Sequence, residues 1–276
     1  MDGRPDFRVL GPVEVGSLGD WHGGIPPMTR RLLALLLSAG PEGMTVPRLV
    51  SGMWGDDYPA SARQMVRSHV MRLRAVLERV ARTAAGRSIT HHPYLGYRIE
   101  AEDADIDARV FEKLLRQGRG LMMDGRFAEA AELLEHALGL WRGQHALADV
   151  RDVLDLEAEA VRLEELRLLT EELLVDCHLL EGRVQDLVPR LASLRIRYPL
   201  REKFLAQFML ALSGTGRRVE AMSAYVGSRQ VFIERSGLEP SAQLSTVHGA
   251  LLRGDPWQSV VPLIAPGTGR AAGHLP

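Results

Sequence analysis

The chain contains Ser61-Ala-Arg-Gln-Met-Val-Arg-Ser-His-Val-Met-Arg-Leu-Arg-Ala-Val-Leu-Glu-Arg-Val80, which has the pattern of a basic helix. It is followed by Ile89-Thr-His-His-Pro-Tyr-Leu-Gly-Tyr-Arg-Ile99, the pattern of a short hairpin. Eight arginines and one acidic residue, Glu78, lie between residues 61 and 99, a local charge of +7 in a chain of 276 residues whose formal charge is −1. Positive charge concentrated in this way favours binding to a polyanion.

The residues before this helix predict a small sheet. Residues 7–15 alternate between apolar and polar positions, which predicts one half-buried strand. Glycine-rich turns then place a short partner strand near Trp21 and Ile25.

Three helices are predicted next. Thr29 should cap a helix over 29–39, and a second helix should cover about 46–54. Ser61 should cap the basic helix, which is expected to run to about Ala84. Strands, three helices and a hairpin, in this order, predict a winged helix-turn-helix domain.

One face of the basic helix should be buried and the other free. Val66, Val70, Leu73 and Leu77 recur at helical spacing and should face the core. Gln64, Ser68, Met71, Arg72, Ala75 and Arg79 then project outward, with Arg67, His69 and Arg74 on the flanks. Most of these side chains are of the types that contact base edges and phosphates in a major groove.

The composition fits a soluble protein of about two domains, with 46% hydrophobic and 25% charged residues. Residues 1–100 carry a net charge of +4 and residues 101–276 a net charge of −5, so the two parts should have different roles. The single cysteine, Cys177, cannot form an internal disulfide and fits a reducing compartment as a buried thiol. The longest apolar run, residues 32–37, is too short for a membrane span, and the N-terminus lacks a signal-peptide pattern. We expect a cytoplasmic protein with no membrane partner.

Helical periodicity continues from about Asp107 onward. Gly-Arg recurs at 125–126, 182–183 and 216–217, each time at a predicted turn, and the last two copies are 34 residues apart, the period of tetratricopeptide (TPR) repeats. The fold class is therefore mainly α, with a winged-helix domain over 1–102 and an all-α, TPR-like domain over 103–256. The Pro, Gly and Ala content of residues 257–276 predicts a disordered tail.

A series of longer motifs occurs in order between residues 7 and 256. They are Phe7-Arg-Val-Leu-Gly-Pro-Val-Glu-Val15, Arg31-Leu-Leu-Ala-Leu-Leu-Leu37, Leu49-Val-Ser-Gly-Met-Trp-Gly55, Pro59-Ala-Ser-Ala-Arg63, Val70-Met-Arg-Leu-Arg74, Ala137-Leu-Gly-Leu-Trp-Arg-Gly143, Leu163-Glu-Glu-Leu-Arg167, Tyr198-Pro-Leu-Arg-Glu202 and Gly237-Leu-Glu-Pro-Ser241. With these motifs the chain resembles the Streptomyces antibiotic regulatory proteins (SARPs), which activate secondary-metabolite gene clusters.

The resemblance implies an OmpR-type winged-helix domain followed by a bacterial transcriptional activation domain. Such a protein would bind direct repeats in double-stranded promoter DNA near the −35 region, as a head-to-tail dimer on the bacterial nucleoid. It would recruit RNA polymerase holoenzyme through its sigma factor and neighbouring subunits. The phosphate-binding motif Gly-x-x-x-x-Gly-Lys-Ser/Thr is absent from the sequence, so the ATPase module of large family members is not expected.

The resemblance also assigns roles to residues of the basic helix. The helix with the Arg-Leu-Arg signature would enter the major groove, with Arg72 on a base or alternatively on a phosphate. His69 and Arg74 would contact phosphates, although Arg74 is also a candidate for anchoring the helix internally.

Two neighbouring segments receive roles from the same resemblance. The hairpin 89–99 would be the wing at the minor groove, with the candidate contacts Thr90, His91, His92 and Tyr94. Because it lacks an arginine just before the Gly-Tyr turn, insertion of an arginine into the minor groove is not expected, and contact with bases or with the DNA backbone alone are both left open for the wing. The loop 55–61 would face polymerase through Asp56, Asp57 and Tyr58.

Other chemistry is poorly supported by the sequence. His91 and His92 have no further ligand at metal-binding spacing, and Asp103, Asp105 and Asp107 lack the glycine and terminal glutamate of a calcium loop, so the aspartates are interpreted as a linker. We expect no metal, no cofactor and no catalytic residue, because no Ser/His/Asp or Cys/His set stands in a catalytic context.

Two further hypotheses concern the helical part. Trp141, Tyr198 and Tyr225 are spaced as packing anchors, with a small-molecule pocket there as the alternative. The chain could also be a helical-repeat scaffold whose winged-helix domain serves assembly rather than DNA reading. A docking face on the basic helix should then expose Leu, Phe or Met, and the predicted outward face offers only Met71.

Overall fold

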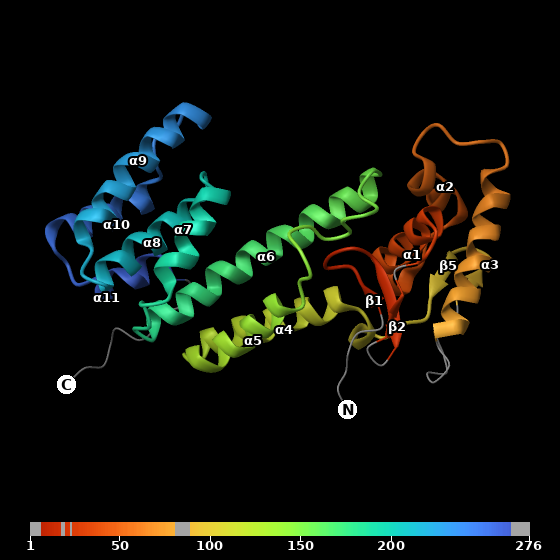
Figure 1. The fold of residues 1–276 in the computed structure, drawn as a ribbon, viewed down its shortest axis with the longest axis horizontal. Coiled ribbons are helices and arrows are strands. Elements are labelled where there is room, and N and C mark those ends of the chain that lie inside the picture. Colours follow the sequence, from red (N-terminus) through yellow and green to blue (C-terminus); the bar gives the residue numbers. More distant parts are fainter. Residues whose placement is uncertain (1–6, 18–19, 23, 81–88, 266–276) are drawn as a thin grey trace. The chain divides into compact units, whose positions relative to one another are not determined.

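The structure is a computed structural model in which residues 7–17, 20–22, 24–80 and 89–265 are described (Figure 1). The chain divides into two compact units. Unit 1 comprises residues 1–114 and 137–168, and unit 2 comprises residues 115–136 and 169–276. Unit 1 therefore contains the whole of the expected winged-helix segment, 1–102, together with parts of the expected helical domain.

The N-terminal sheet of unit 1 has three antiparallel strands, β1 (Phe7–Arg8), β2 (Glu14–Ser17) and β3 (Asp20–His22), in the order β1-β2-β3. The prediction of one strand over 7–15 is wrong, because the chain reverses and Phe7 pairs with Val15. Two local features explain the reversal. Pro12 has no N–H for a strand ladder, and the N–H groups of Val9 and Leu10 donate to the carboxylate of Asp107 instead.

Three helices follow: α1 (Pro27–Ala39), α2 (Val46–Trp54), after the short 3-10 turn η1 (Gly40–Glu42), and α3 (Ala62–Val80). Thr29 does not cap α1, since the N-cap is Pro26 and Thr29 lies buried inside the first turn. The backbone carbonyl of Ser61 accepts the N–H of Met65 at the start of α3. The expected extension of this helix to Ala84 lies outside the described residues.

The predicted hairpin is present as β4 (Ile89–His92) and β5 (Gly96–Ile99). Met44 and Tyr97 exchange two backbone hydrogen bonds, which tie β5 to the loop before α2. Gly96 has φ +78°, and a Cβ there would lie 2.1 Å from the Met44 carbonyl oxygen, so this turn requires glycine. Strands, three helices and a wing confirm the winged helix-turn-helix prediction.

The rest of the chain is helical. After the turn η2 (Asp103–Asp105), the helices are α4 (Asp107–Met123), α5 (Phe127–Gly139), α6 (Leu154–Leu180), α7 (Leu187–Arg197), α8 (Glu202–Gly214), α9 (Arg218–Ser236), α10 (Ala242–Arg253) and α11 (Trp257–Val260), followed by the turn η3 (Val261–Leu263). No helix among the described residues is long and apolar enough to cross a membrane.

The Gly-Arg pairs terminate α4, α6 and α8. Gly125, Gly182 and Gly216 have φ between +74° and +78°, which places each in the left-handed region. The N–H of each following arginine donates to a carbonyl five residues earlier, as when Arg126 donates to Leu121. This is the Schellman motif, so the repeat seen in the sequence is a repeated helix-termination signal.

The expectation of disorder from residue 257 is wrong for residues 257–265, which include α11 and η3. Val260 and Val261 are buried within unit 2, where α11 packs against α8 and α10, and the Nζ of Lys203 donates to the Ile264 carbonyl. The apolar side chains of this segment outweighed its Pro and Gly content. Residues 266–276, for which disorder was also expected, lie outside the described residues.

The expected linker aspartates include a buried structural residue, Asp107. Its side chain is almost fully buried in unit 1 and accepts the N–H groups of Val9 and Leu10 at 2.8 and 3.1 Å. Burial raises the pKa of Asp107 to about 6, against the opposing effect of these hydrogen bonds and of Arg142. Asp107 therefore holds the turn between β1 and β2 rather than belonging to a free linker.

Candidate nucleic-acid interface

The exposed face of α3 is basic, as predicted. Val66, Val70, Leu73 and Leu77 are buried in the winged-helix core. The exposed residues on the opposite side are Arg63, Gln64, Arg67, Ser68, Met71, Arg72, Ala75, Glu78 and Arg79. The helix is therefore held by its apolar stripe and presents its cations to solvent.

The exposed arginines of α3 have no counter-ion among the described residues. Within the described part of the chain, no carboxylate forms an ion pair with Arg63, Arg67, Arg72 or Arg79. Unpaired guanidinium groups keep all their donors available for phosphate oxygens or guanine edges. Arg63 was missed as a candidate, although it lies one turn before Arg67, and this spacing puts both on one face.

His69 was expected to contact a phosphate, and the structure contradicts this. Its side chain is only 6% exposed, and its Nδ1 lies 3.0 Å from the hydroxyl oxygen of Thr29. Burial and, to a smaller extent, the charge of Arg72 lower the pKa of His69, so the neutral form is favoured. The residue packs α3 against α1, and its position in the helix falls on the buried side of the flank.

Arg74 takes the second of its two predicted roles. Its Nε and Nη2 atoms donate to the carbonyl oxygen of Ile89 at 3.1 and 2.6 Å. Arg74 therefore braces α3 against the first strand of the wing.

The two uncharged candidates on α3 differ in their freedom. The hydroxyl of Ser68 donates to the Gln64 carbonyl one turn earlier, at 3.3 Å. The amide side chain of Gln64 is exposed and available for a base or phosphate.

The wing is more internally bonded than the helix. The hydroxyl of Thr90 donates to Glu100, which is also paired with Arg98, and these two hydrogen bonds lower the pKa of Glu100. The Nδ1 of His92 lies 3.3 Å from the N–H of Tyr94, so this imidazole supports the turn.

All four wing candidates are exposed to solvent, and Tyr94 and His91 differ in what their rings contact. The ring of Tyr94 at the tip is 86% exposed. His91 is exposed and packs against Tyr97, with ring centroids 4.8 Å apart. The ring of Tyr94 is thus accessible to a partner at the tip of the wing.

The loop before α3 presents the other predicted surface. Asp56, Asp57 and Tyr58 are all exposed, with Tyr58 at 55%. Among the described residues, no group of three or more His, Cys, Asp or Glu side chains is arranged to hold a metal ion.

The aromatic anchors of the helical part are placed separately. Trp141 packs edge-on against Phe111 in unit 1, with centroids 5.6 Å apart. Tyr225 stacks on His248 at 3.8 Å, and Tyr198 lines a cavity in unit 2. The three aromatic residues therefore do not form one pocket.

Comparison with known proteins identifies both parts of the chain. A family model described as "Transcriptional regulatory protein, C terminal" matches residues 24–99, and one described as "Bacterial transcriptional activator domain" matches residues 106–252. These matches and the winged-helix site define a DNA-binding transcriptional regulator.

Relatives that match most of this chain narrow the choice of family. Regulatory protein DnrI of Streptomyces peucetius is 32% identical over 253 residues, covering 91% of this chain and 93% of DnrI. Transcriptional regulator RedD of Streptomyces coelicolor is 31% identical, covering 92% of this chain and 72% of RedD. Regulatory protein AfsR of Streptomyces griseus is 30% identical over 90% of this chain, which spans only 24% of AfsR.

A solved structure extends the comparison to the fold. Mycobacterium tuberculosis EmbR, in complex with a low-affinity phosphopeptide, is similar with a TM-score of 0.85 and 27% identity, covering 94% of this chain and 68% of that one. The chain belongs to the SARP family of transcriptional activators. This family consists of regulators rather than enzymes.

Proposed function

We propose that the protein activates transcription by binding direct repeats in promoter DNA near the −35 region and recruiting RNA polymerase through its sigma factor. The target would be a secondary-metabolite cluster, and the protein would act on the nucleoid in the cytoplasm. In this proposal residues 1–102 read DNA and residues 103–256 form the activation domain.

The observation that carries the proposal is the unpaired basic face of α3. Arg63, Arg67, Arg72 and Arg79 are exposed without a carboxylate partner in the described part of the chain. Placed in a major groove, such a face gives phosphate contacts that set affinity and base contacts that set specificity. We assign the base contact to Arg72 and phosphate contacts to Arg63 and Arg67.

The wing and the loop complete the proposed complex. Tyr94 would lie against the sugar-phosphate backbone at the adjacent minor groove, while Arg74 fixes the angle between helix and wing. Asp56, Asp57 and Tyr58 would meet polymerase. Two protomers would bind head to tail on half-sites about one helical turn, roughly 10–11 bp, apart.

The scaffold hypothesis is less well supported. Within α3, all of whose residues are described, Met71 is the one large apolar side chain exposed, at 70%. A protein-docking face would require a larger apolar patch.

In-vitro selection from random duplex DNA with the full chain tests DNA reading. We expect enrichment of a direct repeat with one-turn spacing. Salt-sensitive retention without an enriched motif would leave only non-specific binding, and no retention would favour the scaffold.

Transcription assays with purified holoenzyme test recruitment on a selected repeat. We expect Asp56→Ala combined with Tyr58→Ala to reduce activation while DNA affinity stays unchanged. Full activation by this variant would contradict the assignment of the loop. The matched control is Asp103→Ala, which removes an exposed carboxylate outside the loop.

A further inference from the structure

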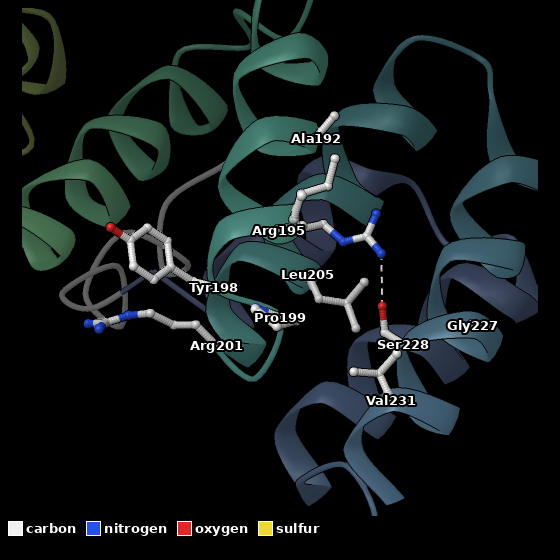
Figure 2. Close-up of a pocket in the computed structure, with 10 residues that line it drawn as sticks. Ala192, Arg195, Tyr198, Pro199, Arg201, Leu205, Gly227, Ser228 and Val231 are labelled. Carbon is white, nitrogen blue, oxygen red and sulfur yellow. Dashed lines mark hydrogen bonds between the residues drawn. The ribbon is translucent and has the colours of Figure 1, made fainter. Parts of the chain in front are cut away.

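Unit 2 contains a cavity of about 320 Å³ between α7, α8 and α9 (Figure 2). Its walls are formed mainly by the apolar residues Ala192, Ile196, Pro199, Leu205 and Val231. This volume lies at the lower end of the range for small-molecule sites, which combine apolar walls with a few polar groups.

One of the polar groups in this cavity is a cation, Arg195. Figure 2 shows its side chain crossing from α7 toward Ser228 on α9, where Nη2 donates to the hydroxyl oxygen at 2.8 Å. The guanidinium also lies over the ring of Phe208, 4.5 Å from the centroid. These contacts fix the position of the guanidinium at the cavity wall.

Arg195 has no counter-ion in the part of the chain that the structure describes. Burial lowers the pKa of Arg195, which reflects the cost of holding this charge away from water. The other arginine of the cavity, Arg201, is bonded to Glu172 through Nε at 2.6 Å. A guanidinium has five donor hydrogens. The contacts of Arg195 with the Ser228 hydroxyl and the Phe208 ring leave most of these donors without an acceptor among the described residues.

An anion with two oxygens would match the free edge of this guanidinium, because carboxylate and guanidinium form paired hydrogen bonds. The apolar walls indicate that the rest of the ligand is apolar. Because Arg201 is paired with Glu172, Arg195 is the cation available to a ligand, and it suits one negative charge on an apolar body better than a doubly charged, strongly hydrated phosphate.

We propose that this cavity binds a small organic acid, with its carboxylate on Arg195 and Ser228 and its apolar body against Leu205 and Val231. The site belongs to the helical part of the chain and does not depend on how α3 contacts DNA.

Isothermal titration calorimetry with matched probes tests the proposal on the full chain. The probes are octanoate and 4-phenylbutanoate, each compared with its primary amide. We expect at least one acid to bind the unmodified protein at least tenfold more tightly than its amide.

Three variants locate the site. Arg195→Gln should weaken binding of the acid at least tenfold and remove its preference over the amide. Arg197→Gln is the matched control, since it removes an exposed arginine of the same helix turn and should leave binding unchanged. Gly227→Leu should block acid and amide alike, because Gly227 lines the cavity and a Cβ built there meets no atom within 4 Å, which leaves room for a larger side chain at the cavity wall.

Circular dichroism and DNA retention check that each variant is folded. Because leucine has a higher helix propensity than glycine, Gly227→Leu keeps the test decisive if Arg195→Gln is unstable. Equal binding of acid and amide, unchanged binding by Arg195→Gln, or no binding of any probe at millimolar concentration would overturn the proposal. Tighter binding of a peptide through its free C-terminal carboxylate would also overturn it, in favour of a polypeptide end.

Discussion

The arginines of α3 and those of the helical part have different surroundings. On α3, Arg63, Arg67, Arg72 and Arg79 are exposed and have no ion-pair partner among the described residues. Outside α3, several exposed arginines lie beside a carboxylate. Examples are Arg126 with Glu129, Arg162 with Glu159, Arg217 with Glu220 and Arg229 with Glu239.

This difference shows where the positive charge is available. The chain has thirty-two arginines and two lysines, so an arginine count alone says little about any segment. An exposed ion pair adds little to stability, but it cancels the field of its arginine. The unpaired face of α3 retains its field and can replace the counter-ions of DNA.

Buried charges form a third group with a structural role. Asp107 accepts two backbone N–H groups of the β1–β2 turn and lies 3.8 Å from Arg142. Removing such a carboxylate should change stability, whereas removing an arginine of α3 should change DNA binding. The predictions below use this contrast.

We expect the largest effect from Asp107→Ala. It leaves the N–H groups of Val9 and Leu10 buried without an acceptor, so the free energy of unfolding should fall by about 3–5 kcal/mol. Chemical denaturation followed by tryptophan fluorescence measures this change. Asp103→Ala, at an exposed position of the same acidic segment, is the control and should stay within about 0.5 kcal/mol of the unmodified protein. A loss below 1 kcal/mol for Asp107→Ala would contradict the structural role.

The pH dependence of stability should reveal the same carboxyl group. Its pKa is raised to about 6 in the folded state from 3.8, so folding is favoured by protonation. Its contribution is complete below about pH 4 and is lost as the pH rises through 6, a change of about 2–3 kcal/mol.

Comparison with Asp107→Asn isolates this effect, because the amide does not titrate. As the pH rises from 4 to 6.5, the free energy of unfolding of the unmodified protein should fall relative to that of the variant. A constant difference in unfolding free energy over this range would show that the pKa of Asp107 is not raised in the folded state.

The next effect concerns the α3 face itself. Arg72→Ala should weaken specific DNA binding by about 1–3 kcal/mol and relax base preference at one position. Its unfolding free energy should stay within about 0.5 kcal/mol, because the side chain is exposed and unpaired. Competition binding against single-base variants of a selected site measures the affinity and the base preference. Unchanged affinity and preference would remove Arg72 from the base contact.

The comparison also explains which features the sequence could predict. The winged helix and the basic face of α3 follow from helical periodicity and charge, which are local properties. The partners of His69, Arg74 and Asp107 depend on Thr29, Ile89 and the β1–β2 turn, which are distant in sequence. Periodicity placed His69 on the flank of the helix, but only the packing of α1 shows that this flank is covered.

Composition gave the wrong boundary at the C-terminus for a similar reason. Pro and Gly suggested a tail from residue 257, whereas Val260, Val261 and Ile264 are buried in the fold. The cavity beside Arg195 also required the fold, because its residues come from three helices. Of the proposed aromatic anchors, only Tyr198 lines it.

The smallest effect should come from Arg67→Ala. As a phosphate contact, Arg67 should support all sequences alike, so its loss should weaken binding uniformly and leave base preference unchanged. The slope of log affinity against log salt should fall by about 1, because one fewer counter-ion is released. Arg126→Ala is the matched control: this exposed arginine is paired with Glu129 outside the winged helix, and its removal should leave the slope unchanged. If both variants behave alike, pairing does not distinguish the two groups of arginines, and the DNA-binding face must be assigned on other grounds.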